Sequence, residues 1–403
     1  MIRKMRRGRL TLCLAFGFIT LVIATALLIH TQCLKPSISY YQILEEHIQN
    51  HKPITEKRTK YILLYTNFFE DKLWKLPTET VGPDYFRATQ CPRTDCVLTS
   101  NHDLLPVVTD YDALVFHIAE PWAYSVFRKV PSVRSSRQIF VAATMESPAH
   151  TKHLLGGDHD FFNWTMTYRL DSDIVWNYNN FVERDSGRVV RPGKDLQSQM
   201  VGHEVVFNQT LLEMATVKTK MGVQFISHCE TFSRRDDLVR AIQRFMEVDV
   251  YGKCGTMECP RDSPRCAKML TDEYRYYFAF ENSLCKDYVT EKMYYAMQSF
   301  IIPVVFGGAD YTKFVPPKSY IDAQQFATVQ DLVEYLVFLA ENPEHYIKYF
   351  WWKDHYRIAD TQPFCELCQK LHDIGTKEKM QYYKDIKAWW FDEACWMDAK
   401  IKF

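Results

Sequence analysis

The chain has 403 residues, of which 49 are lysine or arginine and 49 are aspartate or glutamate, so its formal net charge is zero. A neutral chain exerts no long-range attraction on nucleic acid or on an anionic membrane surface, and we expect no nucleic-acid partner. The aromatic share of 15% suits large cores and stacking on sugar faces, and the length exceeds what one hydrophobic core usually organises. Two domains are therefore expected.

The N-terminus combines a basic cluster with a long apolar run. Residues 1–9 carry five basic side chains, and residues 10–29 contain no charged side chain. A helix of this length spans about 30 Å, the thickness of the hydrocarbon core of a bilayer. Because basic flanks stay in the cytosol, we predict a cytoplasmic tail over 1–9, a signal-anchor transmembrane helix over 10–29 and a lumenal remainder. Residues 30–59 are polar and are interpreted as a stem.

Cysteine and asparagine patterns agree with a compartment of the secretory pathway. Of the 12 cysteines, ten remain when Cys13 and Cys33, in or beside the apolar run, are set aside. An even number of cysteines in an oxidising lumen predicts mainly disulfides. Asn163 and Asn208 each begin an Asn-x-Thr sequence, the acceptor site for N-glycosylation in the same compartment.

From Lys60 onward, short apolar runs alternate with longer connections. The runs 61–66, 113–118 and 138–144 are typical of strands buried on both faces of a parallel sheet. The segment 184–195 is rich in glycine, proline and charge, and we interpret it as a loop.

A second series of strands and helices follows. Alternating strands and helices of about ten residues predict a parallel α/β sheet. Two such units in tandem predict two Rossmann-like domains, over residues 60–205 and 206–355, followed by a C-terminal segment over 356–403. The strands of the second series are expected over 223–227, 248–252, 276–280 and 301–307, and the helices over 211–220, 236–246, 290–299 and 328–342.

The stretch ENSLCKDYVTEK follows the predicted strand 276–280. Ligands of open parallel sheets bind at the carboxyl ends of strands, near the N-termini of the following helices. Thr290 and Glu291 open the next predicted helix, whose amide dipoles favour an anion, and Lys292 adds a full positive charge. These residues suit a phosphate-bearing donor, with a carboxylate left over to accept hydrogen bonds from sugar hydroxyls. The alternative is a capping threonine beside an exposed Glu-Lys pair.

Five stretches of the sequence resemble signatures of one enzyme family, the α1,3-fucosyltransferases of glycosyltransferase family 10, and they occur in the same order as in that family. The resemblance covers roughly residues 60–370 and implies the GT-B fold, in which two Rossmann-like domains face each other, behind a transmembrane helix. It also implies a single-pass type II protein of the Golgi membrane. The stretches are Ala143–His150, Asn163–Tyr178, Val248–Gly255, Phe278–Gly308 and Pro316–Leu336.

The resemblance implies inverting transfer of L-fucose from GDP-fucose to the 3-hydroxyl of a GlcNAc in glycoprotein glycans. Residues 60–205 would form the acceptor side, and residues 206–355 would bind GDP-fucose. No tightly bound cofactor is expected, and manganese or magnesium would at most stimulate. Fixed cations or amides must neutralise charge on the leaving diphosphate, and a carboxylate must take the proton of the attacked hydroxyl.

Family motifs carry these roles onto particular residues. Glu146 is expected to be the catalytic base, because it follows a predicted strand of the first domain and Pro148 turns the chain there. A helix-capping role is the alternative for Glu146. His228 stands where the family usually has asparagine. This departure leaves open whether Arg235 is in register with the arginine of the family motif. The expected donor contacts are Arg235, Asn282, Tyr288, Glu291 and Lys292, with Glu291 on the ribose hydroxyls. Tyr288 could instead only pack, and Asn282 could be a turn residue.

Two motifs suggest metals, and we expect none at either. Asp171 and Asp173 form an Asp-x-Asp motif that binds manganese in another glycosyltransferase fold, but here it is expected in the first domain, away from the donor region. The pairs Cys91/Cys96 and Cys365/Cys368 would also fit a four-thiolate zinc site. A lumenal location and the family pattern favour disulfides that tie the C-terminal segment to the first domain, with the pairing open.

The acceptor is the least determined feature. The reducing-end GlcNAc of an N-glycan core and the GlcNAc of a LacNAc or LacdiNAc antenna both offer a 3-hydroxyl. The cluster of Cys254, Cys259 and Cys266 resembles invertebrate family members and favours the N-glycan core. An inactive lumenal glycan-binding protein on the same scaffold is the rival from another functional class. His153 and His159 are placed in an acceptor-side loop, and self-association into a homo-oligomer stays open.

Overall fold

The structure is a computed structural model that describes residues 59–119, 131, 133–151, 160–200, 208–260, 263–374 and 381–403. The predicted tail, the signal-anchor helix and the stem up to residue 58 lie outside the described residues. Among the described helices, none is long and apolar enough to cross a membrane. One compact unit contains the described residues except Val133–Ser136.

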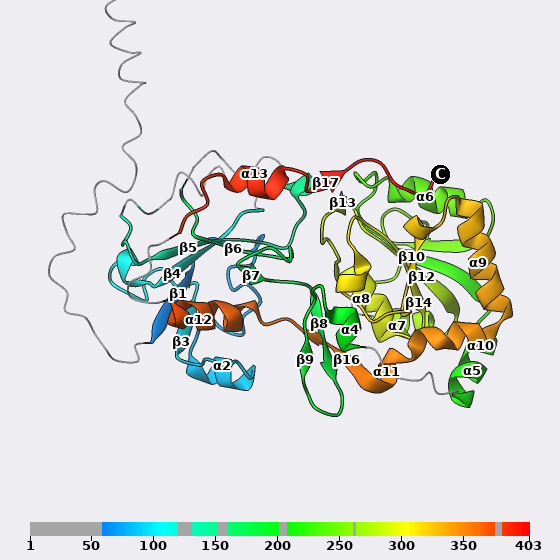
Figure 1. Cartoon of the computed structure of the whole chain (residues 1–403), viewed down its shortest axis with the longest axis horizontal. Helices are drawn as coiled ribbons and strands as arrows, with labels where there is room; N and C mark the ends of the chain where they lie inside the picture. Colours follow the sequence, from blue (N-terminus) through cyan, green and yellow to red (C-terminus); the bar gives the residue numbers. More distant parts are fainter. Residues whose placement is uncertain are drawn as a thin grey trace, which may run out of the picture. The chain divides into compact units, whose positions relative to one another are not determined.

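A sheet of seven strands occupies the first part of the chain (Figure 1). Its strands are parallel except for the edge strand β2, which pairs antiparallel with β3. Every residue of β4 and β5 is buried, which is why these strands read as continuous apolar runs. In spatial order the strands are β2 (Thr80–Val81), β3 (Cys96–Thr99), β1 (Lys60–Leu64), β4 (Ala113–His117), β5 (Ile139–Thr144), β6 (Trp164–Thr167) and β7 (Ile174–Val175).

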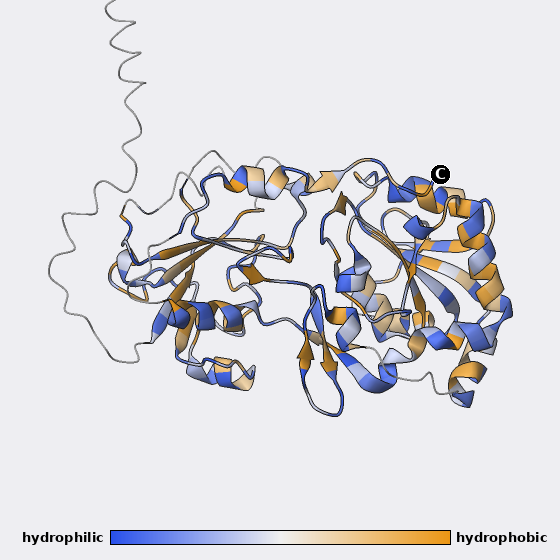
Figure 2. Cartoon of the chain, viewed as in Figure 1, coloured by the Kyte–Doolittle hydropathy of each residue, from blue (hydrophilic) through white to orange (hydrophobic). Residues whose placement is uncertain are grey.

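A second sheet of five strands is entirely parallel. The predicted strands of this series are present, with bounds that shift by up to three residues. Their spatial order is β11 (Val248–Tyr251), β10 (Lys220–Phe225), β12 (Tyr274–Phe280), β14 (Ile302–Phe306) and β15 (Ile321–Asp322). In Figure 2 the strands of the first sheet are mainly hydrophobic and those of the second sheet are mixed. Alternate residues of β12 lie in two different hydrophobic clusters, so both faces of the second sheet are covered.

Helices connect and cover the strands of the second sheet. The longest, α9, begins with a capping box in which Thr328 and Asp331 each accept from the backbone of the other. The predicted helix over 211–220 is shorter, because Lys220 already begins β10. The helices of this part are α5 (Gln209–Thr216), α6 (Arg235–Ile242), α7 (Pro264–Asp272), α8 (Glu291–Gln298), α9 (Val329–Glu341), α10 (Pro343–Tyr346) and α11 (Trp352–His355).

The segment 184–195, expected to be a loop, contains secondary structure. β9 (Val189–Val190) pairs antiparallel with β8 (Asn179–Glu183), and β8 pairs with β16 (Tyr356–Asp360). Val190 is buried, so a short apolar pair inside a polar segment was enough to form a strand. The loop interpretation was therefore wrong at this position. Two short helices, α2 (Pro83–Ala88) and α4 (Leu196–Gln199), lie elsewhere in the first half of the chain.

The C-terminal segment contacts residues of both sheets. Helix α12 (Pro363–Asp373) shares a hydrophobic cluster with Ile62 of β1, whereas α13 (Ile386–Phe391) shares another with Leu63. Neighbouring residues of a strand point to opposite faces, so the two helices cover opposite faces of the first sheet. Strand β17 (Cys395–Trp396) then pairs with β13 (Leu284–Cys285), and Ile401 joins the core of the second sheet.

Five disulfides are present among the described residues, and two of them involve the pairs for which a zinc site was the alternative. Cys91 is bonded to Cys365, and Cys96 to Cys368. His372 lies close to Cys96 and Cys368, but sulfurs joined in a disulfide are not thiolate ligands. The other bridges are Cys229–Cys254, Cys259–Cys266 and Cys285–Cys395.

Removing the Cys96–Cys368 bridge by replacing both cysteines with serine is expected to destabilise the protein only moderately. The two bridges to α12 close nearly the same loop, with sequence separations of 274 and 272 residues. While Cys91–Cys365 remains, only the short ring between the bridges opens, so the free energy of unfolding should fall by about 2 kcal/mol. Denaturant unfolding without reductant measures this loss. A variant that lacks both bridges should lose at least twice as much, and equal losses would contradict the explanation.

Candidate active site

The strand order of the second sheet reverses at β10. Strands β11 and β12 follow β10 in the chain but lie on opposite sides of it. In open α/β sheets, ligands bind beyond the carboxyl ends of the strands at such a reversal. The loops that leave β10 and β12 there span residues 226–234 and 281–290. They contain or adjoin every predicted donor residue.

Glu281 is fully buried at the end of β12. Its carboxylate accepts hydrogen bonds from the Thr290 backbone nitrogen at 2.8 Å and from the Thr290 hydroxyl at 2.8 and 3.0 Å. Lys292 Nζ lies 3.2 Å from the same carboxylate. Glu281 therefore already occupies the N-terminus of α8, so the carboxylate expected to be left over for sugar hydroxyls is not this one.

Lys292 lies between two carboxylates. Besides Glu281, its amine contacts Glu291 at 3.3 Å. Burial lowers the pKa of Lys292, but Glu281 and Glu291 outweigh burial and hold the pKa above its usual value. Glu291 itself is exposed at the surface of α8. The cation is thus fixed in position and stays charged at neutral pH.

Arg235, the first residue of α6, is buried and links the loop 226–234 to the end of β12. Its guanidinium donates to the carbonyl of Phe280 at 2.9 Å and to the carbonyl of His228 at 2.7 Å. The contact with residue 228 involves the backbone, so it does not depend on whether the side chain there is histidine or asparagine. Burial lowers the pKa of Arg235, with Glu281 acting in the opposite direction.

Glu146 follows β5 of the first sheet and meets residues that follow β12. Tyr288 Oη donates to Glu146 Oε1 at 2.9 Å, and the backbone nitrogen of Ser147 donates to the same oxygen at 3.0 Å. Ser283 Oγ donates to Ser147 Oγ at 2.7 Å. Burial raises the pKa of Tyr288 well above its usual value, so its hydroxyl stays a donor. Tyr288 therefore orients a carboxylate in addition to packing.

Asn282 is half-buried and holds the two loops together through its backbone. Its carbonyl accepts from the Ser233 nitrogen at 3.1 Å, and its side-chain oxygen accepts from Ser283 Oγ at 3.1 Å.

Sequence reasoning missed Tyr178, whose hydroxyl donates to the carbonyl of Met145 at 2.9 Å beside Glu146. Tyr178 belongs to the stretch Asn163–Tyr178, which was the available signal.

Comparison with known proteins adds to this geometry. The family model described as "Glycosyltransferase family 10 (fucosyltransferase) C-term" matches residues 215–389. The family model described as "Fucosyltransferase, N-terminal" matches residues 57–179. The chain belongs to glycosyltransferase family 10. This family 10 member is 42% identical to alpha-(1,3)-fucosyltransferase C of Drosophila melanogaster, over 98% of the chain and 91% of that relative.

A second relative and a solved structure are more distant. Glycoprotein 3-alpha-L-fucosyltransferase A of Drosophila melanogaster is 32% identical over 83% of this family 10 member, which spans only 60% of that relative. A crystal structure of an alpha1,3-fucosyltransferase has a TM-score of 0.50 at 15% identity, covering 83% of this chain and 95% of the other. That likeness concerns the fold.

The Asp-x-Asp motif of this family 10 fucosyltransferase was expected to lie away from the donor region. It lies instead beside the loop 281–290, which we call the donor loop. Asp171 contacts Arg169 at 2.6 Å and Lys286 of the loop 281–290 at 3.0 Å. Asp173 accepts from Tyr383 Oη at 2.9 Å and lies 3.4 Å from Lys370. Each carboxylate has protein donors as partners and connects segments that are distant in the sequence.

The two predicted glycosylation sites differ in their surroundings. Asn163 is only 3% exposed, and its amide accepts from the Phe140 nitrogen at 2.8 Å and donates to the Gln381 carbonyl at 3.0 Å. This burial argues against a glycan on Asn163. Asn208 is half-buried and caps α5 by accepting from the Leu211 nitrogen at 3.1 Å, and a glycan there stays a prediction. His153 and His159 lie outside the described residues.

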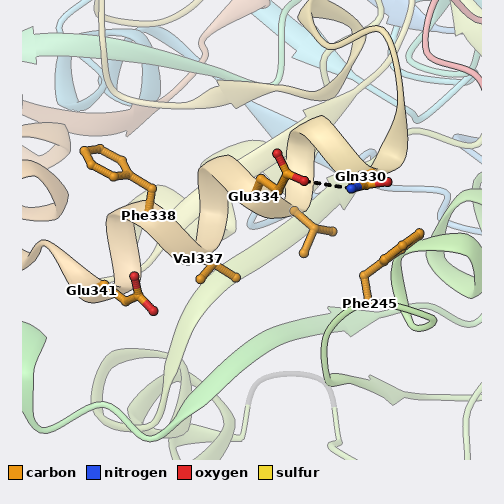
Figure 3. Close-up of a pocket in the computed structure, with 7 residues that line it drawn as sticks. Phe245, Gln330, Glu334, Val337, Phe338 and Glu341 are labelled. Atoms are coloured by element: carbon orange, nitrogen blue, oxygen red, sulfur yellow. Dashed lines mark hydrogen bonds between the residues drawn. The ribbon is translucent and has the colours of Figure 1, made fainter.

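A groove on α9 is unrelated to these residues (Figure 3). It has a volume of about 360 Å³, and Gln330 donates to Glu334 along it at 2.8 Å. Its charged lining residues, Glu334 and Glu341, would repel a diphosphate. The candidate active site is therefore the region of Glu146 and the loops 226–234 and 281–290.

Proposed function

We propose that this family 10 member transfers L-fucose from GDP-fucose, with inversion, to the 3-hydroxyl of a GlcNAc in glycoprotein glycans. The observation that carries the proposal is the contact between Tyr288 and Glu146. It brings a carboxylate from the end of β5 to the loop that precedes Lys292. The names of the two Drosophila melanogaster relatives support the α1,3 linkage and a glycoprotein substrate.

Each role in the reaction has a residue suited to it. The acceptor hydroxyl attacks C1 of fucose, the bond from C1 to the phosphate oxygen breaks, and GDP leaves with the electron pair. Glu146 takes the hydroxyl proton, held in orientation by Tyr288 and the Ser147 nitrogen. Lys292 and Arg235 supply positive charge for the leaving diphosphate, with Asn282 and Glu291 as further donor contacts. This chemistry requires no metal, although manganese or magnesium could stimulate it.

The N-glycan core is the acceptor that we propose, with the predicted type II orientation in the Golgi membrane. The two bridges Cys229–Cys254 and Cys259–Cys266 account for the cysteine cluster that favoured the core. Disulfides suit an oxidising lumen, which supports the location. We also propose that the two sheets form the cores of facing GT-B domains over 60–205 and 206–355.

The test uses the full chain, produced in an oxidising host and incubated with GDP-fucose and two acceptors. One acceptor is a paucimannose N-glycopeptide and the other a LacNAc oligosaccharide, and mass spectrometry measures the added fucose. We expect fucose on the glycopeptide alone. Transfer to LacNAc alone would replace the core acceptor by an antennal one. GDP binding without transfer to either would favour the inactive glycan-binding protein.

A further inference from the structure

Three ring side chains lie together beside the candidate active site. The ring centroids of His150 and His228 are 5.3 Å apart, and those of His150 and Phe232 are also 5.3 Å apart. His150 ends the short turn Pro148–His150 that follows Glu146, whereas His228 and Phe232 belong to the loop 226–234. We call these three residues the ring platform.

Phe232 is exposed although its loop is firmly held. The phenylalanine is 41% exposed, whereas its neighbours Thr231 and Ser233 are buried. A disulfide joins Cys229 to Cys254, and Ser233 Oγ donates to the carbonyl of Glu281 at 2.6 Å. A loop that is already held in place loses little conformational entropy when a ligand binds to it.

His150 has a polar nitrogen that no described residue satisfies. Its Nε2 is buried and makes no hydrogen bond with any described residue. Burial lowers the pKa of His150, with Glu146 acting in the opposite direction and His228, Arg235 and Lys292 adding to the lowering. The imidazole is therefore neutral at pH 7, with one nitrogen that donates and one that accepts, which matches the hydroxyl groups of a sugar.

We propose that the ring platform binds a pyranose ring, either the fucosyl group of the donor or a sugar of the acceptor. An aromatic face and a neutral imidazole together suit a sugar, which has apolar C–H faces and hydroxyl edges. His150 ends the turn that begins two residues after Glu146, so the platform belongs on the side of the proposed base and not on that of the guanine. This inference rests on the proposed function.

The test compares the full-length wild-type chain with the variants Phe232→Ala and His150→Gln. Phe338→Ala is the matched control, because Phe338 is a similarly exposed phenylalanine, at 44%, on α9. Calorimetry at pH 7 measures the affinity for GDP, for GDP-fucose and for a paucimannose N-glycopeptide. Thermal unfolding checks that each variant is folded.

Phe232→Ala should weaken binding of one sugar ligand by roughly two- to tenfold and leave GDP affinity unchanged. His150→Gln should weaken binding of the same ligand. A loss confined to GDP-fucose assigns the fucosyl group, and a loss confined to the glycopeptide assigns an acceptor sugar. Unchanged affinities, an equal loss for GDP, or an equal effect of Phe338→Ala would each overturn the inference. Binding requires no turnover, so absence of fucose transfer by the wild type would refute only the proposed function.

Discussion

Glu146→Gln should remove nearly all fucose transfer and leave GDP binding intact. The amide can still accept from Tyr288 Oη and from the Ser147 nitrogen, which lie 2.9 and 3.0 Å from the carboxylate, so the local geometry should persist. It can no longer take the proton of the attacked hydroxyl. General bases contribute roughly 10²- to 10⁴-fold, and we expect a loss of turnover in this range.

Turnover at saturating GDP-fucose and calorimetry with GDP measure the two effects separately. Glu334→Gln is a suitable control, because Glu334 is an exposed glutamate on α9 with a hydrogen bond from Gln330. A Glu146→Gln variant that keeps more than a tenth of wild-type turnover would refute the assignment. Loss of GDP binding would instead show that the residue supports the donor site.

Lys292→Met should reduce both stability and GDP affinity, for two different reasons. The Glu281 side chain is 1% exposed and that of Lys292 is 17% exposed, so the substitution leaves a buried carboxylate without its cation. Removing one partner of a buried ion pair typically lowers the free energy of unfolding by about 3–5 kcal/mol. The diphosphate also loses one of its proposed cations, which should weaken GDP binding by at least roughly tenfold.

A second substitution separates these two effects. In Glu281→Gln/Lys292→Met the buried charge is gone, while the amide oxygen can still accept from Thr290. Most of the lost stability should return, and GDP affinity should stay low. Denaturant unfolding and calorimetry on the single and double variants make the comparison. If GDP affinity returns together with stability, Lys292 is a structural residue and not a donor contact.

The strands and the main helices could be predicted because their signals are local. A strand buried on both faces must be mainly apolar, and β4, β5, β14 and the end of β12 after Arg275 are nearly continuous apolar runs for this reason. The capping pair Thr328 and Asp331 marks the start of α9 within four residues. The pairing of β8 with β16 has no such local signal, because β16 comes from the C-terminal segment. The strand β9, which also pairs with β8, has only two residues inside a polar segment.

For the candidate site, the residues by themselves indicated which side chains gather after β12, and family motifs added Glu146 and Arg235. Tertiary structure decided what those side chains contact. The N-terminus of α8 was assigned to an anion, yet the buried carboxylate of Glu281 already fills it through hydrogen bonds from Thr290. Asp171 looked remote, yet it pairs with Lys286 of the donor loop.

Local sequence thus determined the two α/β series, the polar loops at their strand ends and the charge of each candidate residue, because strand burial and helix capping depend on a few neighbouring residues. The tertiary structure alone decided which charges are already neutralised and which are left for a ligand. That choice depends on contacts between residues far apart in the chain, such as Tyr288 with Glu146 and Arg235 with Phe280. Burial then sets the strength of those contacts, and burial is a property of the folded chain.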